Sequence, residues 1–304
     1  MVTTPSKAGP AAPAVEFRNV SLSFGETQAL KDVSFELWPG QMIVITGLSL
    51  SGKSVLLHLA IGLLEPDEGE ILIEGRAIKA LDEEELLKVR SSRMGIVFQE
   101  DTLFTSLDVY ENTAYRLTEH GWSNDAADRA VGEILRFVGL EKDVDKLPEE
   151  LSIGMRRRLE IARALAGWPP IVLYDEPTSG LDPLTARQVL DLVIRARDVY
   201  NITSLYVTKE LHQIKYLGGH YAARDERGVI SVCKGDAPQL CQMKVMVLEN
   251  GKIVFFGDPD EFEESSLPAV AQLTHPTGSM RFTDSHIADP WSNARQIRDK
   301  CRRP

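Results

Sequence analysis

Eight consecutive residues have the types and spacing of a phosphate-binding loop. They read Gly47-Leu48-Ser49-Leu50-Ser51-Gly52-Lys53-Ser54 and fit the pattern G-x-x-x-x-G-K-[ST]. An apolar run at 42–46 precedes them and a helix-like run begins at Val55, which is the strand–loop–helix context that the pattern requires. Backbone N–H groups and the dipole at the start of such a helix favour a bound phosphate. The alternative is a plain glycine turn between a buried strand and a buried helix.

Two side chains of this loop and two later carboxylates suit phosphoryl transfer. Lys53 can neutralise terminal phosphates, and Ser54 can place its hydroxyl on a Mg²⁺ ion. Asp175 and Glu176 follow an apolar run at 171–174, and ligands of open α/β sheets bind at such strand ends. We expect Asp175 to hold the metal, directly or through water, and Glu176 to polarise the water that attacks the γ-phosphate. The alternative is a solvated acidic turn.

Composition narrows the class of protein. The chain has 304 residues, 43% of them hydrophobic and 26% charged, as in ordinary globular proteins. Its net charge of −11 argues against a general nucleic-acid binder. The longest apolar stretch, 42–64, is interrupted by the phosphate loop, so we expect no membrane span. Cys233, Cys241 and Cys301 form neither a disulfide framework nor a zinc pattern. Pairing or metal binding by Cys233 and Cys241 is the alternative to unpaired thiols.

Hydrophobic periodicity predicts strands that alternate with helices, and therefore an α/β core. Asp82 and Glu85 form a capping-box pattern at one helix start. The expected strands are 15–18, 33–37, 70–75, 95–98, 171–174 and 204–207, with a hairpin at 244–256 and an extra hairpin from 221–223 and 229–232. The expected helices are 109–140, interrupted near 120–121, then 151–166, and one that starts at 183. We expect 1–14 to be a disordered tail and 258–304 a loosely ordered extension.

A second motif, together with the phosphate loop, makes residues 15–257 resemble the ATPase subunits of ATP-binding cassette (ABC) transporters. Leu151-Ser152-Ile153-Gly154-Met155 is similar to the family's signature motif, usually Leu-Ser-Gly-Gly-Gln, at the start of a helix. In the family this helix start reaches the γ-phosphate held by the other subunit of a dimer, so the resemblance implies that Ser152 and Gly154 bind nucleotide. A plain N-cap role for Ser152 is compatible with this. Ile153 and Met155 depart from the usual Gly and Gln.

The resemblance implies a P-loop NTPase ABC-ATPase fold with a RecA-like core, an antiparallel β subdomain and an α-helical signature subdomain at about 100–167. It implies ATP and Mg²⁺ as cofactors. Gln99 matches the glutamine loop that senses Mg²⁺ and contacts the membrane subunit, and Ser179 to Asp182 match the D-loop. Phe24 resembles the aromatic residue that stacks on adenine, with a core position as the alternative. The nucleotide-binding set thus comprises Phe24, Gly47 to Val55, Ser152 and Gly154, and the metal set comprises Ser54, Gln99 and Asp175.

The catalytic set implied by the resemblance is Glu176, Gln99 and Lys209. Lys209 is a departure, because the family usually has His at this position. A lysine there can neutralise the γ-phosphate, or it can pair with Glu176 and slow hydrolysis. Leu50 also departs, since it stands where the family often has Gly; backbone N–H groups can still hold the phosphates.

Residues 98–115 are similar to the Mla/Mce-type ATPases of bacterial phospholipid transport, which also often have Met at the end of the signature. This implies a subunit that dimerises on ATP, as a homodimer, and moves phospholipid or another hydrophobic substrate through an integral membrane permease. It also implies an Mce-type substrate-binding protein, no nucleic acid, and a peripheral position on the cytoplasmic face of the inner membrane. Two alternatives stay open: an ATP-gated regulatory subunit with weak hydrolysis, and a soluble non-transport ABC ATPase.

Overall fold

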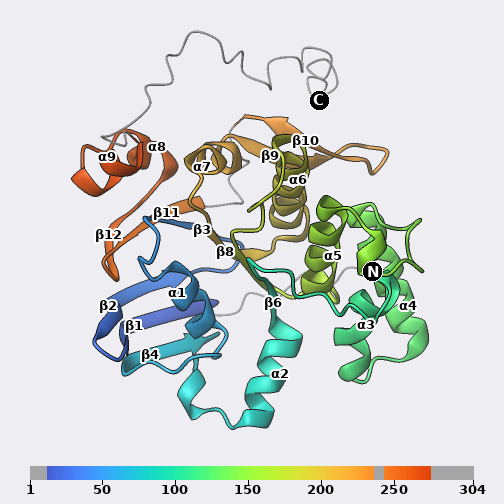
Figure 1. Cartoon of the computed structure of the whole chain (residues 1–304), viewed down its shortest axis with the longest axis horizontal. Coiled ribbons are helices and arrows are strands. Elements are labelled where there is room, and N and C mark those ends of the chain that lie inside the picture. Colours follow the sequence, from blue (N-terminus) through green and yellow to red (C-terminus); the bar gives the residue numbers. More distant parts are fainter. Residues whose placement is uncertain (1–11, 236–242, 275–304) are drawn as a thin grey trace.

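The computed structural model describes residues 12–235 and 243–274. Its central feature is a six-stranded sheet in the order β12-β11-β3-β8-β7-β6, seen in Figure 1. The strands are β3 Met42–Thr46, β6 Met94–Val97, β7 Ile171–Asp175, β8 Thr203–Val207, β11 Met243–Glu249 and β12 Lys252–Gly257. Neighbouring strands are parallel except β12, which pairs antiparallel with β11. The carboxyl ends of β3, β8 and β7 therefore meet at one edge of the sheet.

A second, antiparallel sheet has the order β2-β1-β4-β5. Its strands are β1 Val15–Phe24, β2 Thr27–Leu37, β4 Glu68–Ile73 and β5 Arg76–Ala77. The helix α1, Lys53–Ala60, buries Leu56, Leu57 and Leu59 in one core with side chains of both sheets. After η1, Ile78–Ala80, the helix α2, Glu83–Arg93, begins at Asp82 with the predicted capping box to Glu85.

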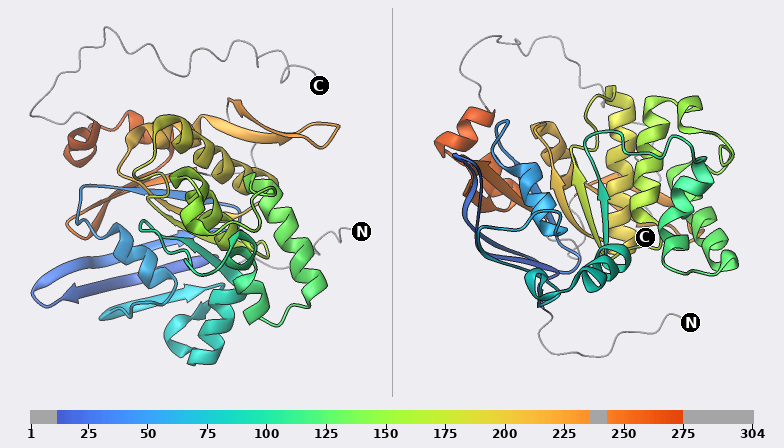
Figure 2. Two further views of the ribbon diagram at one scale, coloured as in Figure 1. Left: turned by 45° about the vertical axis from the view of Figure 1, so that its right-hand side comes forward. Right: turned by 60° about the horizontal axis from the view of Figure 1, so that its bottom comes forward.

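Helices gather on the side of the central sheet away from the antiparallel sheet, as the right-hand view of Figure 2 shows. They include α3 Val109–Glu119, α4 Asn124–Val138, η2 Pro148–Glu150 and α5 Ile153–Leu165, and the predicted break near 120 separates α3 from α4. A Cβ on Gly95 would lie 2.1 Å from the Ala164 carbonyl oxygen. The glycine therefore lets α5 approach β6 closely, which fixes the helical subdomain against the core.

The second half of the chain adds α6 Pro183–Tyr200, α7 Leu211–Gly218 and the hairpin β9 His220–Arg224 with β10 Ile230–Lys234. This hairpin confirms the extra hairpin that the sequence predicts. Arg197 and Asp198 of α6 attach it, because Arg197 Nη2 donates to the His220 carbonyl at 2.8 Å and Asp198 Oδ2 accepts from Ala222 N at 2.7 Å. Its role as a surface elaboration stays a prediction.

The two ends of the described chain differ from the expected boundaries. Ala14 was predicted to lie in the disordered tail, but it is buried and its N–H donates to the Leu37 carbonyl at 2.8 Å. The predicted extension begins with two helices, α8 Pro259–Glu263 and α9 Pro268–Thr274, and Phe262 of α8 is buried against β12. The rest of both predicted tails, 1–11 and 275–304, lies outside the described residues, as do Cys241 and Cys301.

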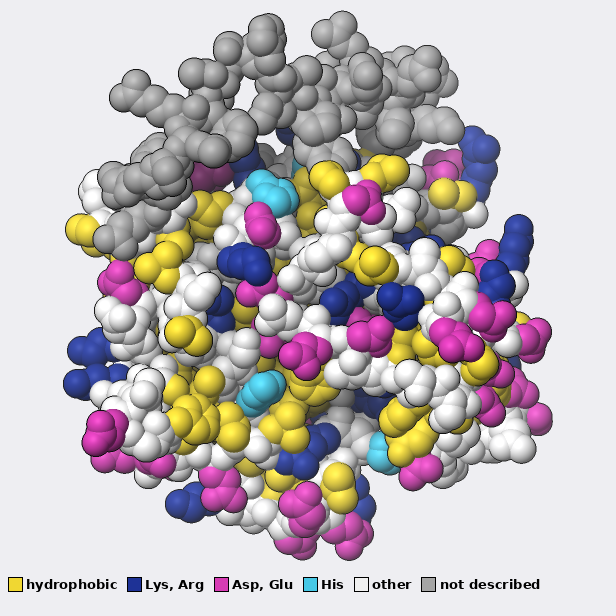
Figure 3. Space-filling view, viewed as in Figure 1, with side chains coloured by type: hydrophobic (Ala, Val, Ile, Leu, Met, Phe, Trp, Pro, Cys, Tyr) yellow, Lys and Arg dark blue, Asp and Glu magenta, His cyan; other side chains and the backbone are white. Residues whose placement is uncertain are grey.

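Within residues 12–235 and 243–274 no helix is long and apolar enough to span a membrane. Acidic and basic side chains are mixed across the face shown in Figure 3, without a continuous basic area on that face. The prediction about nucleic acid remains a prediction.

Candidate functional site

The phosphate loop joins β3 to α1 and is closed around its own lysine. Lys53 is 7% exposed, and its Nζ donates to the carbonyls of Gly47 at 2.9 Å and Leu48 at 2.7 Å. It also contacts Ser51 Oγ at 3.3 Å. Burial lowers the pKa of Lys53, while Glu176 and Asp175 act in the opposite direction. The loop therefore holds a desolvated cation at its centre, where a phosphate would provide a stronger partner than the carbonyls.

Gly47 and Gly52 must be glycines, because another segment of backbone lies too close to each of them for a side chain. Gly47 has φ 146°, and a Cβ there would lie 2.1 Å from the Leu248 carbonyl oxygen. Gly52 has φ 101°, and its Cβ would lie 2.6 Å from the Ala29 carbonyl oxygen. Leu50, where the resembling family often has Gly, adopts φ 64° with a fully exposed side chain. The Leu50 side chain therefore extends into solvent and does not pack over the loop.

Ser54 and Asp175 meet as the metal prediction requires. Ser54 Oγ lies 3.2 Å from Asp175 Oδ1, although 121 residues separate them in the chain. Asp175 is 4% exposed, and burial raises its pKa, opposed by the hydrogen bond from Ser54. A hydroxyl and a buried carboxylate are hard oxygen ligands that suit Mg²⁺, which usually binds through one or two carboxylates plus substrate phosphates. No group of three or more His, Cys, Asp or Glu gathers as a metal site in the described part of the chain.

Glu176 and Lys209 form an ion pair at the same edge of the sheet. Glu176 Oε2 lies 3.0 Å from Lys209 Nζ, with side-chain exposures of 14% and 51%. Glu176 adopts φ 42°, and its N–H donates to the Val207 carbonyl at 3.0 Å. This left-handed turn at the end of β7 is uncommon for a residue other than glycine. Of the two possibilities for Lys209, the structure contains the pairing with Glu176.

The sequence analysis did not single out Gln213. This residue of α7 forms hydrogen bonds to residues at the carboxyl ends of β7 and β8. Gln213 is 2% exposed, and its Nε2 donates to Thr178 Oγ1 at 2.7 Å. Its Oε1 accepts from Tyr206 Oη at 2.8 Å and from Thr208 Oγ1 at 3.1 Å. It thus ties the residue before Lys209 to the loop after Glu176. The available signal was an amide on a helix whose neighbours Ile214 and Leu217 are apolar and buried.

The signature residues lie apart from the phosphate loop, because α5 and α1 are separated in both Figure 1 and Figure 2. Ser152 is the N-cap of α5, and its Oγ accepts from Met155 N at 3.2 Å. A Cβ on Gly154 would lie 2.4 Å from Thr185 Cγ2, so glycine lets the start of α5 pack on α6. Ile153 is 61% exposed at this helix start. The chain alone does not bring Ser152 and Gly154 to Lys53.

Two further predicted residues lie on the surface. Gln99 follows β6 with an exposed side chain, while its carbonyl accepts from Arg157 Nη2 at 2.9 Å. Phe24 ends β1 and is 51% exposed. The core position considered for Phe24 is therefore wrong, and its ring is free to meet a planar ligand. Val55, in the first turn of α1, packs instead against the buried core.

Comparison with known proteins shows which family and which fold this chain resembles. Residues 30–179 match the family model described as ABC transporter. The methionine import ATP-binding protein MetN of Leifsonia xyli subsp. xyli is 38% identical over 219 residues, which cover 71% of this chain and 64% of that protein. The probable ribonucleotide transport ATP-binding protein mkl of Mycobacterium leprae is 39% identical, over 67% of this chain and 58% of that protein. The chain thus spans less than two thirds of these relatives.

Solved structures share the fold. A dimeric ATP-binding cassette in a post-hydrolysis state, bound to ADP and Pi, aligns with a TM-score of 0.66 and 28% identity, over 81% of this chain and 98% of that chain. A component of the ABC transporter complex cbiONQ from Clostridium perfringens aligns with a TM-score of 0.69 and 25% identity, over 87% of this chain and 96% of that chain. These alignments confirm the predicted fold class.

Proposed function

We propose that this chain binds and hydrolyses ATP as the nucleotide-binding subunit of an ABC transporter, because residues 30–179 match the family model described as ABC transporter. The observation that carries the proposal is the convergence of Lys53, Ser54, Asp175 and Glu176 at the carboxyl ends of β3 and β7. Lys209 joins them from the end of β8 through its ion pair with Glu176. Ligands of open parallel sheets bind at this edge.

Lys53 and the loop hold the phosphates. In the structure Lys53 Nζ donates to two loop carbonyls, and entry of ATP would replace these neutral acceptors with phosphate oxygens. Backbone N–H groups at the start of α1 would cradle the same phosphates, helped by the helix dipole. Phe24 would stack on the adenine ring with its exposed face.

Ser54 and Asp175 would hold Mg²⁺ with the phosphates, and Gln99 would reach the ion from the end of β6. The metal would neutralise charge that develops on the phosphate oxygens during transfer. Desolvation of Asp175 raises its pKa, which favours occupation of this position by a cation.

Glu176 would polarise the attacking water. The water oxygen attacks the γ-phosphorus, its proton passes to the Glu176 carboxylate, and the bond to the ADP oxygen breaks. Lys209 would exchange Glu176 for the γ-phosphate, which frees the carboxylate and adds a positive charge next to the transferring group. Gln213 acts through its neighbours by holding Thr208 and Thr178, and is a positioning residue.

A second subunit would complete each site. Ser152 and Gly154 lie at the N-terminus of the 13-residue helix α5, which favours an anion, yet α5 is separated from α1 within one chain. A facing copy would bring its α5 to the γ-phosphate held by this chain, and we favour a homodimer. Similar cassettes have been solved as dimers. Closing and opening of this dimer would drive an integral membrane permease, with the chain peripheral on the cytoplasmic face of the inner membrane.

The cargo is proposed on resemblance alone. The similarity of residues 98–115 to Mla/Mce-type ATPases favours phospholipid or another hydrophobic molecule, with an Mce-type binding protein as a further partner. The relatives are named for methionine import and ribonucleotide transport, so the cargo test must include those compounds. With the permease complex in phospholipid-free detergent micelles, added phospholipid should stimulate ATP hydrolysis more than methionine or a ribonucleotide does. Stimulation by methionine alone would overturn the lipid assignment.

ATP binding and phosphate release by the full chain test the function. The wild-type chain should bind ATP and release phosphate, and Lys53→Ala should lose both because it removes the central cation. Lys79→Ala is a matched control, since Lys79 is exposed and lies outside the loop. Binding without release, with and without the permease, would instead support the regulatory subunit. Release that ribosomes or DNA stimulate, and that no permease affects, would support the soluble ATPase.

A further inference from the structure

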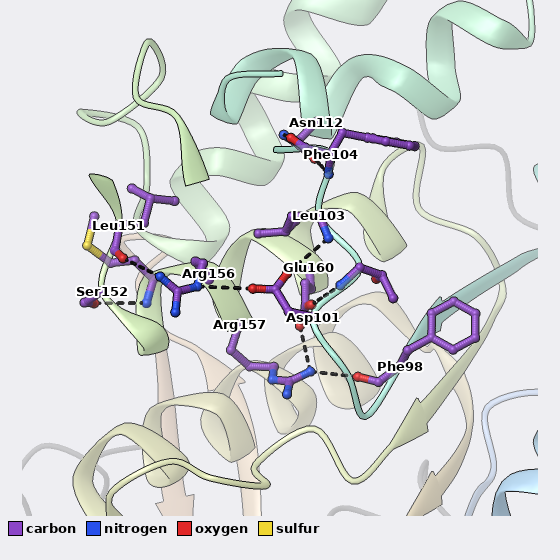
Figure 4. A network of polar contacts seen from close by, with 12 residues as sticks. Phe98, Asp101, Leu103, Phe104, Asn112, Leu151, Ser152, Arg156, Arg157 and Glu160 are labelled. Carbon is purple, nitrogen blue, oxygen red and sulfur yellow. Dashed lines mark hydrogen bonds and ion pairs between the residues drawn. The ribbon is translucent and has the colours of Figure 1, made fainter. Parts of the chain in front are cut away.

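Side chains of α5, the helix that carries the signature motif, form hydrogen bonds to the segment that carries Gln99. Arg157 and Glu160 of α5 are both buried, with side-chain exposures of 10% and 3%, and Arg157 Nη1 lies 2.6 Å from Glu160 Oε2. The same Nη1 donates to the Phe98 carbonyl at 2.7 Å, and Nη2 donates to the Gln99 carbonyl at 2.9 Å. Figure 4 shows this guanidinium between α5 and the segment after β6.

Glu160 extends the contact to the next turn of the segment. Its Oε1 accepts from Thr102 N at 3.1 Å, and Arg163 Nη1 donates to the Thr102 carbonyl at 2.7 Å. Residues 98–102 are therefore held at both ends by side chains of one helix. The segment has no sheet partner of its own, because the pairing of β6 with β7 ends at Val97.

The geometry suits positioning better than stability. Burying an ion pair costs desolvation and is often no better for stability than apolar packing. A planar guanidinium, however, can bind two carbonyls and a carboxylate in fixed directions, which a lysine cannot. Arg157 uses this capacity on the backbone of Gln99, whose side chain remains exposed. Glu160 in turn fixes the guanidinium, since it is the buried carboxylate in contact with it.

We propose that Arg157, held by Glu160, is a positioning residue that locks Gln99 to the signature helix, so that residues 98–102 and the start of α5 move as one body. The inference rests on the proposed role of Gln99 at the nucleotide. Its consequence is direct: a displacement of Gln99, caused by nucleotide or by a membrane partner, is transmitted to Ser152 and Gly154. The signature residues then reach the facing site only when Gln99 is in place.

The test is a double-mutant cycle on the full chain. Arg157→Gln should lower kcat for ATP about tenfold with little change in KM, because the groups that bind ground-state ATP are untouched. In a Gln99→Ala background the same substitution should lower kcat less than about twofold, since Arg157 acts through Gln99. A second tenfold loss in that background would overturn the proposal.

Arg158→Gln is the matched control. Arg158 is the next residue of α5, and its Nη1 also donates to backbone carbonyls, those of Val138 at 2.9 Å and Gly139 at 3.1 Å, away from Gln99. Arg158→Gln should change kcat by less than about twofold. Equal losses of kcat in Arg157→Gln and Arg158→Gln would show that the loss comes from a less stable α5 and not from the contact with Gln99. If Arg157→Gln does not fold, Arg157→Lys keeps a cation beside Glu160 and should show the same loss.

Hydrogen exchange separates this inference from the proposed function. Amides of residues 98–102 should exchange faster in Arg157→Gln than in the wild-type or Arg158→Gln chain, without any nucleotide. If residues 98–102 exchange faster in Arg157→Gln but the wild-type chain hydrolyses no ATP, the positioning role of Arg157 is supported and the proposed function is refuted. Unchanged exchange in an active enzyme would refute the lock alone.

Discussion

Lys209 Nζ lies 3.0 Å from Glu176 Oε2, so the proposed catalytic base carries a counter-ion at the edge of the sheet. The hydrogen bond with Glu176 raises the pKa of Lys209, which therefore stays charged at neutral pH. Half of the Lys209 side chain is exposed, whereas Glu176 is mostly covered. The pair can thus separate by movement of the lysine alone, with Glu176 held by its turn.

Removal of Lys209 should reduce hydrolysis rather than increase it. Lys209→Ala frees Glu176 but removes the cation that we place on the γ-phosphate, and kcat should fall about tenfold or more. ATP affinity, measured by equilibrium dialysis, should fall less. His212→Ala is the control, because its imidazole is 65% exposed beside Glu210 and should leave kcat unchanged. A higher kcat in Lys209→Ala would show that the lysine restrains the enzyme.

The phosphate loop should not tolerate a methyl group at Gly47. Gly47→Ala places a Cβ within 2.1 Å of the Leu248 carbonyl, so the loop must move and ATP binding should be lost. Gly121→Ala also adds a Cβ at positive φ, 71°, but meets nothing within 4 Å. It should cost only about 1–2 kcal/mol of stability and keep full binding. Isothermal titration with ATP compares the two; intact binding by Gly47→Ala would contradict the closed loop.

The start of the signature helix should not tolerate a methyl group at Gly154, where it packs on α6. Gly154→Ala would bring its Cβ to 2.4 Å from Thr185 Cγ2, and overpacking of this kind costs about 1–3 kcal/mol. Thr185→Ser removes that methyl and should restore most of the stability and ATPase activity in the double variant. Thermal unfolding and phosphate release measure the two effects. Failure of Thr185→Ser to restore either would place the defect elsewhere.

Stability should fall as pH rises through the range in which Glu160 titrates. Burial raises the pKa of Glu160 to about 7 from its ordinary value of 4.5, against the attraction of Arg157 and Arg163. Between pH 4.5 and about 7, Glu160 is more protonated in the folded chain than in the unfolded chain. Protonation of Glu160 therefore contributes its full stabilisation below pH 4.5, and that stabilisation is lost as the pH rises through about 7. The wild-type free energy of unfolding should therefore decline relative to that of Glu160→Gln over this range. Parallel curves for the two chains would contradict the raised pKa.

Local signals explain how much the sequence predicted. The strand–loop–helix context of Gly47 to Ser54, the position of Asp175–Glu176 at the end of an apolar strand and the capping box at Asp82 depend on neighbouring residues, and the structure contains all three. The sequence did not predict the roles of Gln213 or of the Arg157–Glu160 pair. Arg157, for example, contacts Phe98 and Gln99, which lie 59 and 58 residues earlier in the chain. Such contacts depend on how α5 packs on β6, which no short pattern encodes. Ala14 was wrongly assigned to the disordered tail, because the composition of residues 1–14 predicts disorder and does not reveal that one residue of the segment is buried.

The most direct test of the central claim is phosphate release in a single turnover by Glu176→Gln, beside the wild-type chain and Glu210→Gln. Glu210 is the matched control, since it is a nearby carboxylate with 51% of its side chain exposed. We predict that Glu176→Gln keeps ATP binding but loses about a hundredfold or more in rate, as expected for a general base, while Glu210→Gln releases phosphate at the wild-type rate. Wild-type release by Glu176→Gln would contradict the account.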